Sequence, residues 1–349
     1  MQSIVIANRT LSSQHPVYVI AELSANHGHK LDEALKLVHA AHAAGADAIK
    51  LQTYLPGTMT INSNKPWFQI GKGTIWEGKN LYQLYEEAYT PWEWTQEIMS
   101  LASSLGMHCF STPFDPTAVD YLEKLDMPAY KIASFEVVDL PLLKAIAQTG
   151  RPVIMSTGMA SLSEIDEAVT TLRNHGTKQL ALLKCTSAYP SLPGDMNLRT
   201  IPHLAQAFDV PVGLSDHTMD VAVPVAAVAL GACIIEKHLT MDRSVPGPDS
   251  QFSLEPAEFK AMVAAVRTTS EALGRVQYDV SEKEQASRVF RRSLFVVEDI
   301  QAGQPFTARN VRSIRPGHGL HPRYLDVVIG KTAATNIQAG TPLSWELVG

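Results

Sequence analysis

Short apolar runs alternate with amphipathic segments of helical period between residue 17 and about residue 273. This alternation is typical of repeated βα units, in which a helix covers each buried strand. The runs expected to be strands are VYVIAE ending at Glu22, DAIKLQ ending at Gln52, MHCFST ending at Thr112, AYKIAS ending at Ser134, PVIMST ending at Thr157, LALLKC ending at Cys185, PVGLSDH ending at His217 and CIIEKH ending at His238. Eight parallel strands usually close on themselves, so the pattern predicts an α/β fold of the (β/α)8 TIM barrel type.

An open, doubly wound sheet is the alternative arrangement of the same elements. It would require a glycine-rich phosphate loop after an early strand, and no GxGxxG motif occurs in the chain. Caps and breakers mark the helices between the strands. Ser163 with Asp166 is expected to begin the helix in SEIDEAVTTLRNHG, and Gly176 is expected to end it.

Two segments interrupt the barrel pattern. The first is a long insert from Leu55 to Pro91 that contains the aromatic residues Trp67, Trp76, Tyr82 and Tyr85. Loops of this length usually cover something, and βα loops lie at the face of a barrel where substrates bind. The insert is therefore a candidate lid; the alternative is surface decoration with a short helix.

The second interruption is polar and charged, and a small domain follows it. Residues 275–290 have no strand pattern and are interpreted as a linker between a catalytic barrel domain, residues 1–274, and residues 291–349. Within the last segment DIQAGQPFTARNV, from Asp299, recurs as NIQAGTPLSWELV, from Asn336. Such a repeat predicts a pseudo-symmetric β-rich domain that is too small to have a large core of its own.

Composition narrows the function classes. The formal charge is -6 and the pI is about 6.1, and no basic stripe runs along the chain, which argues against nucleic acid as a partner. No run of about 18 apolar residues and no signal-peptide pattern occurs, so we expect a cytoplasmic protein without a membrane anchor. Cys109, Cys185 and Cys233 lie within apolar segments and are expected to be buried free thiols.

Polar and ionisable residues collect at the predicted carboxyl ends of the strands, where a barrel builds its active site. A single strand-end serine or lysine is more often a cap or a solvated terminus, but together these residues predict a site. The residues are Glu22, Lys50, Gln52, Thr112, Lys131, Ser134, Glu136, Ser156, Ser215, His217, Glu236 and His238.

Two histidines are candidate metal ligands. Side chains two positions apart in a strand point the same way, so His217 shares the direction of Ser215 in GLSDHT and His238 that of Glu236 in IIEKH. Both imidazoles can therefore face the barrel axis. Two histidines do not complete a tetrahedral zinc site, whereas an exchangeable octahedral site completed by water and substrate oxygens suits Mn²⁺ or Mg²⁺. A pair of hydrogen-bonded core histidines is the alternative.

An anionic ligand is suggested by one ammonium group and several hydroxyls on neighbouring strand ends. Lys131, with Ser134, Ser156 and Ser215, could bind phosphate oxygens beside the N-termini of the following helices. Glu22 and Glu136 are then candidates for moving protons or positioning hydroxyl groups.

The motifs AELSANH, KLQTY, STPFD, AYKIASFE, STGM, GLSDHT, EKHLT and GPDSQFSL, in this order, resemble the sialic acid synthase family of nonulosonic acid synthases. The resemblance covers nearly the whole chain, and its C-terminal part, with SIRPGHG, is similar to the antifreeze-like (SAF, or β-clip) domain of those enzymes. It implies a metal-dependent condensation of phosphoenolpyruvate with an open-chain N-acetylated amino sugar, with release of phosphate by C–O cleavage. A metal-dependent barrel aldolase or isomerase, and a non-enzymatic carbohydrate-binding or ice-binding protein, are the alternatives from other classes.

The resemblance also implies roles for individual residues. His217 and His238 match the metal ligands, and Lys131, Ser134, Ser156 and Ser215 match the phosphoenolpyruvate-binding positions. Glu136 matches the acidic residue that handles the attacking water. Residues that match sugar-side segments are Glu22, Lys50, Gln52, Tyr189 and Asp249. Arg315 matches an arginine that reaches the neighbouring subunit's active site, which implies a domain-swapped homodimer.

Within the family, the sequence is most similar to the pseudaminic acid synthase branch. The aromatic insert, GPDSQFSL and RSIRPGHGLHPRY carry this similarity, which implies a 2,4-diacetamido-2,4,6-trideoxy sugar as substrate. Synthesis of N-acetylneuraminate or legionaminate is the alternative. Ser187 stands where neuraminate-forming relatives commonly carry asparagine, and no phosphate-binding role is assigned to Asn80.

Overall fold

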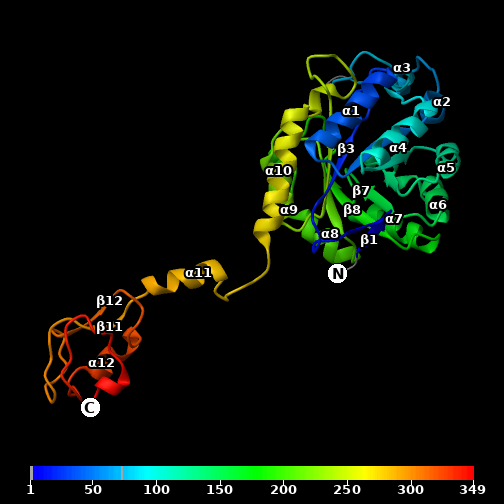
Figure 1. Cartoon of the computed structure of the whole chain (residues 1–349). Coiled ribbons are helices and arrows are strands. Elements are labelled where there is room, and N and C mark those ends of the chain that lie inside the picture. The colour runs from blue at the N-terminus through cyan, green and yellow to red at the C-terminus, as the bar shows by residue number, and fades with distance from the viewer. Residues whose placement is uncertain (1–2, 72–73) are drawn as a thin grey trace. The chain divides into compact units, whose positions relative to one another are not determined.

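The first compact unit, Met1–Gly274, contains a closed barrel of parallel strands (Figure 1). The structure is a computed structural model that describes residues 3–71 and 74–349. The barrel order is β10-β3-β4-β5-β6-β7-β8-β9. The strands are β3 (Tyr18–Glu22), β4 (Ala48–Thr53), β5 (His108–Pro113), β6 (Tyr130–Ile132), β7 (Val153–Ser156), β8 (Leu180–Cys185), β9 (Val212–Asp216) and β10 (Ile234–His238). The predicted (β/α)8 barrel is confirmed.

Helices surround the barrel and bury their apolar faces against it. They are α1 (Leu31–Ala44), α4 (Thr95–Ser104), α5 (Pro116–Glu123), α6 (Leu140–Gln148), α7 (Leu162–Asn174), α8 (Thr200–Phe208), α9 (Ala222–Ala229) and α10 (Pro256–Leu273). The strands are buried on both faces, which explains why their sequences are continuously apolar rather than alternating. The three cysteines are buried free thiols, as predicted.

Some element boundaries differ from the sequence-based expectation. Strand β6 ends at Ile132, and Ser134 instead begins the 3-10 helix η3 (Ser134–Val138). Helix α7 begins earlier than predicted, because Ser161, and not Ser163, is its N-cap. The Ser161 hydroxyl accepts a hydrogen bond from the Glu164 amide, and the Glu164 carboxylate accepts one from the Ser161 amide. The sequence contains two possible serines here, and only the backbone turn selects between them.

A short hairpin, β1 (Ile4–Ile6) with β2 (Arg9–Leu11), was not predicted. Its apolar residues Ile4, Ile6 and Leu11 are part of the barrel unit's core. Arg9 and Arg267 each form an ion pair with the Asp47 carboxylate, just before the start of β4. The hairpin is short and carries few residues of strand periodicity, which is why the pattern alone did not reveal it.

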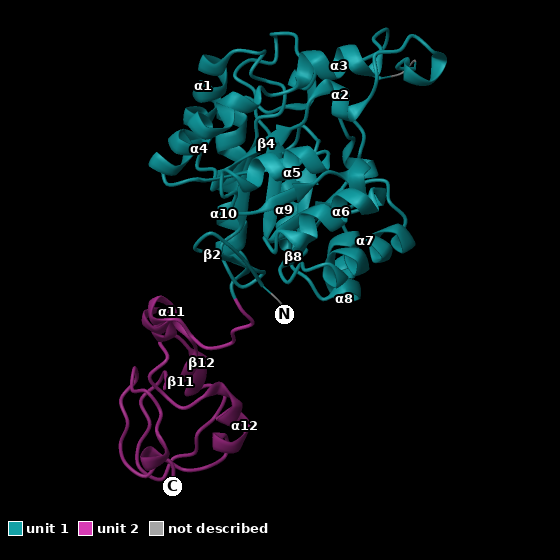
Figure 2. Cartoon of the chain, turned by 90° about the vertical axis from the view of Figure 1, so that its right-hand side faces the viewer, with its two compact units in different colours: residues 1–274 teal, residues 275–349 magenta. Residues whose placement is uncertain are grey.

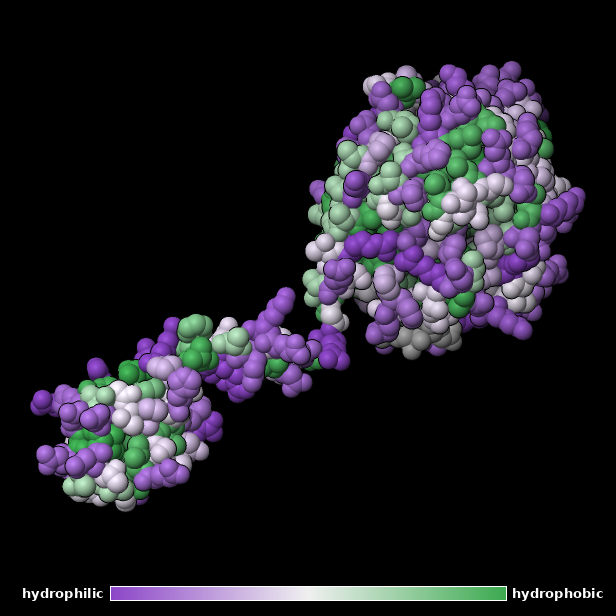
Figure 3. All heavy atoms as spheres, viewed as in Figure 1, coloured by the Kyte–Doolittle hydropathy of each residue, from purple (hydrophilic) through white to green (hydrophobic). Residues whose placement is uncertain are grey.

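The second compact unit is Arg275–Gly349 (Figure 2). Its first residues are exposed and include the short helix α11 (Glu282–Ser287). Strands β11 (Ser293–Val296) and β12 (Val311–Ile314) pair antiparallel, and a small separate core lies beneath them. Both units present a mixture of hydrophilic and hydrophobic residues in Figure 3. No helix within residues 3–71 and 74–349 combines the length and apolar character needed to cross a membrane.

The internal repeat forms a pseudo-symmetric pair inside this unit. Ile300 and Ile337, at equivalent repeat positions, pair antiparallel through both of their backbone hydrogen bonds. The Asp299 carboxylate accepts a hydrogen bond of 2.7 Å from the Ala339 amide, and the Asn336 side chain accepts one of 2.8 Å from the Ala302 amide. Each copy of the repeat therefore caps the turn of the other copy.

Candidate active site

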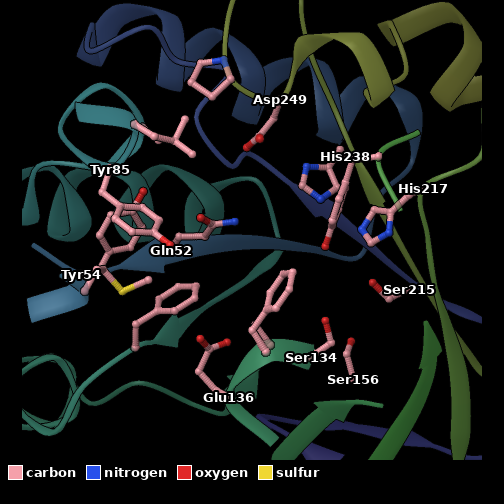
Figure 4. Close-up of a pocket in the computed structure, with 18 of the residues that line it drawn as sticks. Gln52, Tyr54, Tyr85, Ser134, Glu136, Ser156, Ser215, His217, His238 and Asp249 are labelled. Carbon is pink, nitrogen blue, oxygen red and sulfur yellow. The ribbon is translucent and has the colours of Figure 1, made fainter. Parts of the chain in front are cut away.

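A cavity of about 370 Å³ is lined by residues from the carboxyl ends of the barrel strands and from the insert. This volume is in the range of small-molecule sites, which lie at this face of a TIM barrel. The cavity brings together most residues expected from the sequence: Lys50, Gln52, Lys131, Ser134, Glu136, Ser156, Tyr189, Ser215, His217, His238 and Asp249. Figure 4 shows Gln52, Ser134, Glu136, Ser156, Ser215, His217, His238 and Asp249 around a common space.

Buried lysines and glutamates form a network at the base of the cavity. Lys50 Nζ lies 2.5 Å from a Glu22 carboxylate oxygen and 3.3 Å from one of Glu236, and Lys131 Nζ lies 3.6 Å from the same Glu236 oxygen. Burial opposes the charge of Lys50, but the two carboxylates outweigh it and raise the pKa of Lys50. Burial lowers the pKa of Lys131, and Glu236 opposes that change. The base of the cavity therefore holds paired charges. The sequence showed the charged residues but not which of them pair.

Serine hydroxyls line the same cavity as the Lys131 ammonium, and one of them contacts it. Lys131 Nζ donates a hydrogen bond of 2.8 Å to Ser156 Oγ, and Ser134 Oγ lies 2.9 Å from Ser187 Oγ. Gly158 has a φ of 47°, and a Cβ atom there would lie 2.2 Å from Ser134 Cβ. This position therefore requires glycine, which lets the loop after β7 approach the serines. The result is a cluster of donors suited to an oxyanion such as phosphate.

The two histidines lie side by side, as the strand register predicted. Their ring centroids are 5.3 Å apart, and His217 is the first residue after β9 whereas His238 ends β10. His217 Nδ1 lies 3.0 Å from the Thr186 carbonyl oxygen, to which it donates. Burial opposes the charge of His217, but Cys185 and the Thr186 carbonyl outweigh it and raise the pKa of His217. Burial, reinforced by nearby cationic groups, lowers the pKa of His238 well below its ordinary value. Its buried Nδ1 has no hydrogen-bond partner among the described residues.

These observations fit a metal site that the protein only partly completes. Within residues 3–71 and 74–349, no group of three or more His, Cys, Asp or Glu side chains could hold a metal ion. A neutral buried imidazole with an unpartnered nitrogen beside a second imidazole is nevertheless a pair of side chains of the kind that bind divalent metals. Further ligands would have to come from water or substrate.

Two carboxyl groups in the cavity wall have raised pKa values. Burial raises the pKa of Glu136 to about 7, and one of its carboxylate oxygens is buried without a hydrogen-bond partner among the described residues. Burial likewise raises the pKa of Asp249 to about 7, although the Ala25 amide donates to its carboxylate over 3.3 Å. Glu136 follows β6, whereas Asp249 lies in the loop after β10. Groups that titrate near neutrality are suited to proton transfer.

Aromatic residues complete the wall, among them Tyr189, which was expected on the sugar side, and Trp76 of the insert. The Tyr189 ring lies 4.5 Å from His217 and 5.7 Å from Trp76, measured between centroids. Trp76 Nε1 donates a hydrogen bond of 2.8 Å to the Pro248 carbonyl oxygen, next to Asp249. The insert is thus attached to the loop after β10 and lines the cavity instead of being surface decoration alone. The sequence indicated Trp76 as an aromatic residue of the insert, but it did not indicate the hydrogen bond to Pro248.

Four residues considered from the sequence lie elsewhere. Thr112 is buried in β5, where its hydroxyl accepts a hydrogen bond of 3.4 Å from Lys50 Nζ. Glu22 is fully buried beside Lys50 and does not itself line the cavity. Asn80 is buried as the N-cap of α3 (Leu81–Ala88), where its side chain accepts a hydrogen bond from the Gln83 amide. Arg315 is exposed on the second unit, just after β12.

A barrel with this cavity and an appended β-rich domain defines the class of protein, and comparison with known proteins identifies the family. Residues 37–278 match the NeuB family, and residues 291–348 match the SAF domain. A pseudaminic acid synthase of Campylobacter jejuni (strain 81-176) is 47% identical over 327 residues, covering 94% of this chain and 95% of that protein. The N,N'-diacetyllegionaminic acid synthase of Legionella pneumophila is 37% identical and covers 94% of each chain.

Solved structures agree with this assignment. The crystal structure of N-acetylneuraminic acid (sialic acid) synthetase from Leptospira borgpetersenii superposes with a TM-score of 0.73 at 32% identity, covering 82% of this chain and 95% of that chain. The chain belongs to the NeuB family, and it carries a C-terminal SAF domain. The resemblance read from the sequence motifs is confirmed.

Proposed function

We propose that this chain is a transferase that condenses phosphoenolpyruvate with an open-chain 2,4-diacetamido-2,4,6-trideoxy sugar to form pseudaminic acid and phosphate. The convergence of the Lys131 and serine cluster with the histidine pair in one cavity carries the proposal. The relatives named pseudaminic acid synthases support this choice of sugar. Legionaminate and N-acetylneuraminate synthesis are the alternatives, since relatives with those names match at lower identity.

Phosphoenolpyruvate is assigned to the cationic end of the cavity. Lys131, Ser134, Ser156 and Ser215 supply an ammonium group and three hydroxyls for its phosphate and carboxylate oxygens. Ser215 Oγ donates to Glu236 over 3.1 Å, so its orientation is already defined. Burial of these donors strengthens their interaction with an anion, because water does not compete there.

The histidine pair is assigned to a divalent ion, Mn²⁺ or Mg²⁺, with the remaining ligands from water and the sugar. When bound, such an ion supplies Lewis acidity that polarises the sugar aldehyde. His217 is oriented for this role by its hydrogen bond to Thr186, and His238 by burial at the end of β10. The neutral state of His238 keeps its donor nitrogen available.

The reaction then forms one carbon–carbon bond and one carbon–oxygen bond, the latter from water, and breaks the carbon–oxygen bond to phosphate, while the aldehyde oxygen takes up a proton and becomes a hydroxyl group. C3 of phosphoenolpyruvate attacks the aldehyde carbon, water adds at C2, and the tetrahedral intermediate releases phosphate. Glu136 accepts the proton of the attacking water, since its unpartnered carboxylate lies in the cavity wall near Lys131. Lys131 stabilises the charge that develops on the oxygens of the intermediate.

Sugar hydroxyls and acetamido groups are assigned to Lys50, Gln52, Tyr189 and Asp249, which line the same cavity and offer both donors and acceptors. Glu22 is assigned to orienting Lys50 through their ion pair, which would influence catalysis and sugar binding from behind the cavity wall. This differs from direct contact with the sugar, the role implied by the resemblance.

A homodimer is proposed from the surface around the cavity. Large apolar side chains in the loops after β6, β7, β8 and β9 are exposed, an arrangement that marks interaction surfaces. They are Phe135, Val138, Met159, Leu162, Leu192 and Met219. We assign this rim to the SAF domain of a second copy, with Arg315 of that copy contacting the sugar. We also propose the division into 1–274, linker 275–290 and 291–349, and a cytoplasmic location, where phosphoenolpyruvate is available.

Phosphate release tests the proposed function. The protein is incubated with phosphoenolpyruvate, Mn²⁺ and each of the three nonulosonate precursor sugars, and phosphate and a thiobarbiturate-reactive product are measured. We expect both products, with the highest kcat/KM for the 2,4-diacetamido-2,4,6-trideoxy sugar. A retro-aldol product without phosphate from any sugar would establish the aldolase alternative instead.

The histidine pair is tested by substitution. His217→Ala and His238→Ala should each lower turnover and its dependence on added Mn²⁺, with the fold checked by circular dichroism. Metal binding itself is measured by Mn²⁺ electron paramagnetic resonance, in which the free-ion signal should decrease with the unmodified protein and persist with the double variant. Unchanged turnover in both single variants would remove the metal from the mechanism.

A further inference from the structure

The cavity has two chemically different ends. Figure 4 shows His217, His238 and Ser215 on one side and Tyr54 and Tyr85 on the opposite side. Tyr54 directly follows β4, and Tyr85 lies in α3 within the insert. The first end carries imidazoles and hydroxyls, whereas the second is walled mainly by aromatic rings, with the Gln52 side chain beside Tyr54 and Tyr85. A bound molecule that spans the cavity therefore meets polar groups at one end and mainly ring surface at the other.

The aromatic end is a packed wall. The Tyr54 ring contacts the edge of the Tyr85 ring at a centroid distance of 5.8 Å and that of Phe114 at 5.2 Å, with interplanar angles of 77° and 79°. Met59, at the end of α2 (Pro56–Met59), and Leu84 also line the cavity, and α2 packs on α3. Burial raises the pKa of Tyr54 and of Tyr85, so the wall has no ionised phenol at neutral pH.

The orientation of the sugar follows from the proposed function, on which this inference rests. Its aldehyde must lie beside His217 and His238, and phosphoenolpyruvate must lie between it and Lys131. The carbon furthest from the aldehyde then reaches the opposite end of the cavity. At that wall a methyl group gains apolar contacts, whereas a hydroxyl group placed against the ring faces and the Met59 thioether would lose its water and gain no strong hydrogen bond from those surfaces.

We propose that Tyr54, Tyr85, Phe114 and Met59 form a specificity wall that selects a sugar ending in a methyl group over one ending in a hydroxymethyl group. An apolar pocket typically discriminates against one added hydroxyl by on the order of 10- to 100-fold. This selectivity resides in ring and thioether surface, not in a hydrogen bond. The four residues come from three different segments, the end of β4, the insert and the residue after β5, and only the insert was singled out in the sequence.

The test uses two diacetamido sugars that differ only in the hydroxyl at the sixth carbon. The wild-type protein should show a kcat/KM for the 6-deoxy sugar that is about 10- to 100-fold higher. Tyr85→Ala should reduce this ratio to about threefold or less, since it removes most of the apolar surface at that position. Tyr85→Phe should preserve the ratio, because the ring remains. Tyr82→Ala, on the same helix but outside the cavity lining, is the matched control and should also preserve it.

A second variant guards against misfolding of Tyr85→Ala. Met59→Gln is nearly isosteric at a half-buried position and offers an amide to the added hydroxyl, so it should also lower the ratio. A ratio of the two kcat/KM values near one in the wild type would overturn the proposal. So would a ratio in Met59→Gln that equals the wild-type ratio while turnover is normal. Loss of the ratio in Tyr85→Phe would overturn it in favour of selection by the phenol hydroxyl. Absence of phosphate release with every sugar would instead refute the proposed function.

Discussion

Replacing Glu136 by glutamine should make the protein more stable above neutral pH while it lowers activity. Burial raises the pKa of this carboxyl from its ordinary value of 4.5 to about 7. Between these two values the folded protein holds a proton that the unfolded chain has already lost. Stability attributed to Glu136 is therefore fully present below about pH 4.5 and decreases as pH rises to about 7.

The magnitude follows from this difference in pKa. Each pH unit between the two values corresponds to about 1.4 kcal/mol, so the ionised carboxylate costs the folded state about 3 kcal/mol at pH 8. Glutamine carries no charge at any pH and avoids this cost. Glu136→Gln should thus raise the free energy of unfolding by up to about 3 kcal/mol at pH 8 and by little at pH 4. Activity should decrease on the order of 100-fold or more, because the variant cannot accept the water's proton.

Two measurements test this reasoning. Urea unfolding, followed by far-ultraviolet circular dichroism at pH 4 and pH 8, gives the free energies of the wild type and Glu136→Gln. The pH profile of kcat/KM should rise through about pH 7 in the wild type, and this limb should be absent from the variant. The exposed Glu167→Gln is the control and should change neither quantity. A variant that is less stable at pH 8, or that keeps the rising limb, would refute the role of the buried carboxylate.

Two further predictions concern a buried ion pair and the second unit. Lys237 Nζ lies 2.7 Å from an Asp216 carboxylate oxygen, and both side chains are fully buried, so Lys237→Met should lower the free energy of unfolding by about 3 to 5 kcal/mol. Urea titration would measure this loss, which should be partly recovered by combining Lys237→Met with Asp216→Leu; a loss below about 1 kcal/mol would contradict the pairing. Arg315→Ala should raise the KM for the sugar and leave the mass of the proposed dimer, measured by light scattering, unchanged, whereas undiminished activity would exclude its proposed sugar contact.

Local signals in the sequence were enough to locate the barrel strands and their polar ends. Buried parallel strands are continuously apolar, so polar residues within or at the end of such a run, such as Lys131 in β6 and His238 in β10, could be recognised as candidates without coordinates. The repeat at Asp299 and Asn336 was also visible, and its pseudo-symmetric pairing follows from it. Helix ends were less certain, because Ser161 and Ser163 are both acceptable caps and differ only in the turn that precedes them.

The sequence by itself determined the fold class, the family motifs and which chemical groups are available at the barrel mouth. Tertiary structure decided which of these groups meet. Glu22 forms an ion pair with Lys50 behind the cavity wall, and Trp76 donates a hydrogen bond to the Pro248 carbonyl. The Tyr54 ring packs against the Phe114 ring. The physical reason is that strand periodicity depends on neighbours a few residues away. These contacts join segments separated by up to 172 residues, and they depend on barrel closure and on the path of the insert.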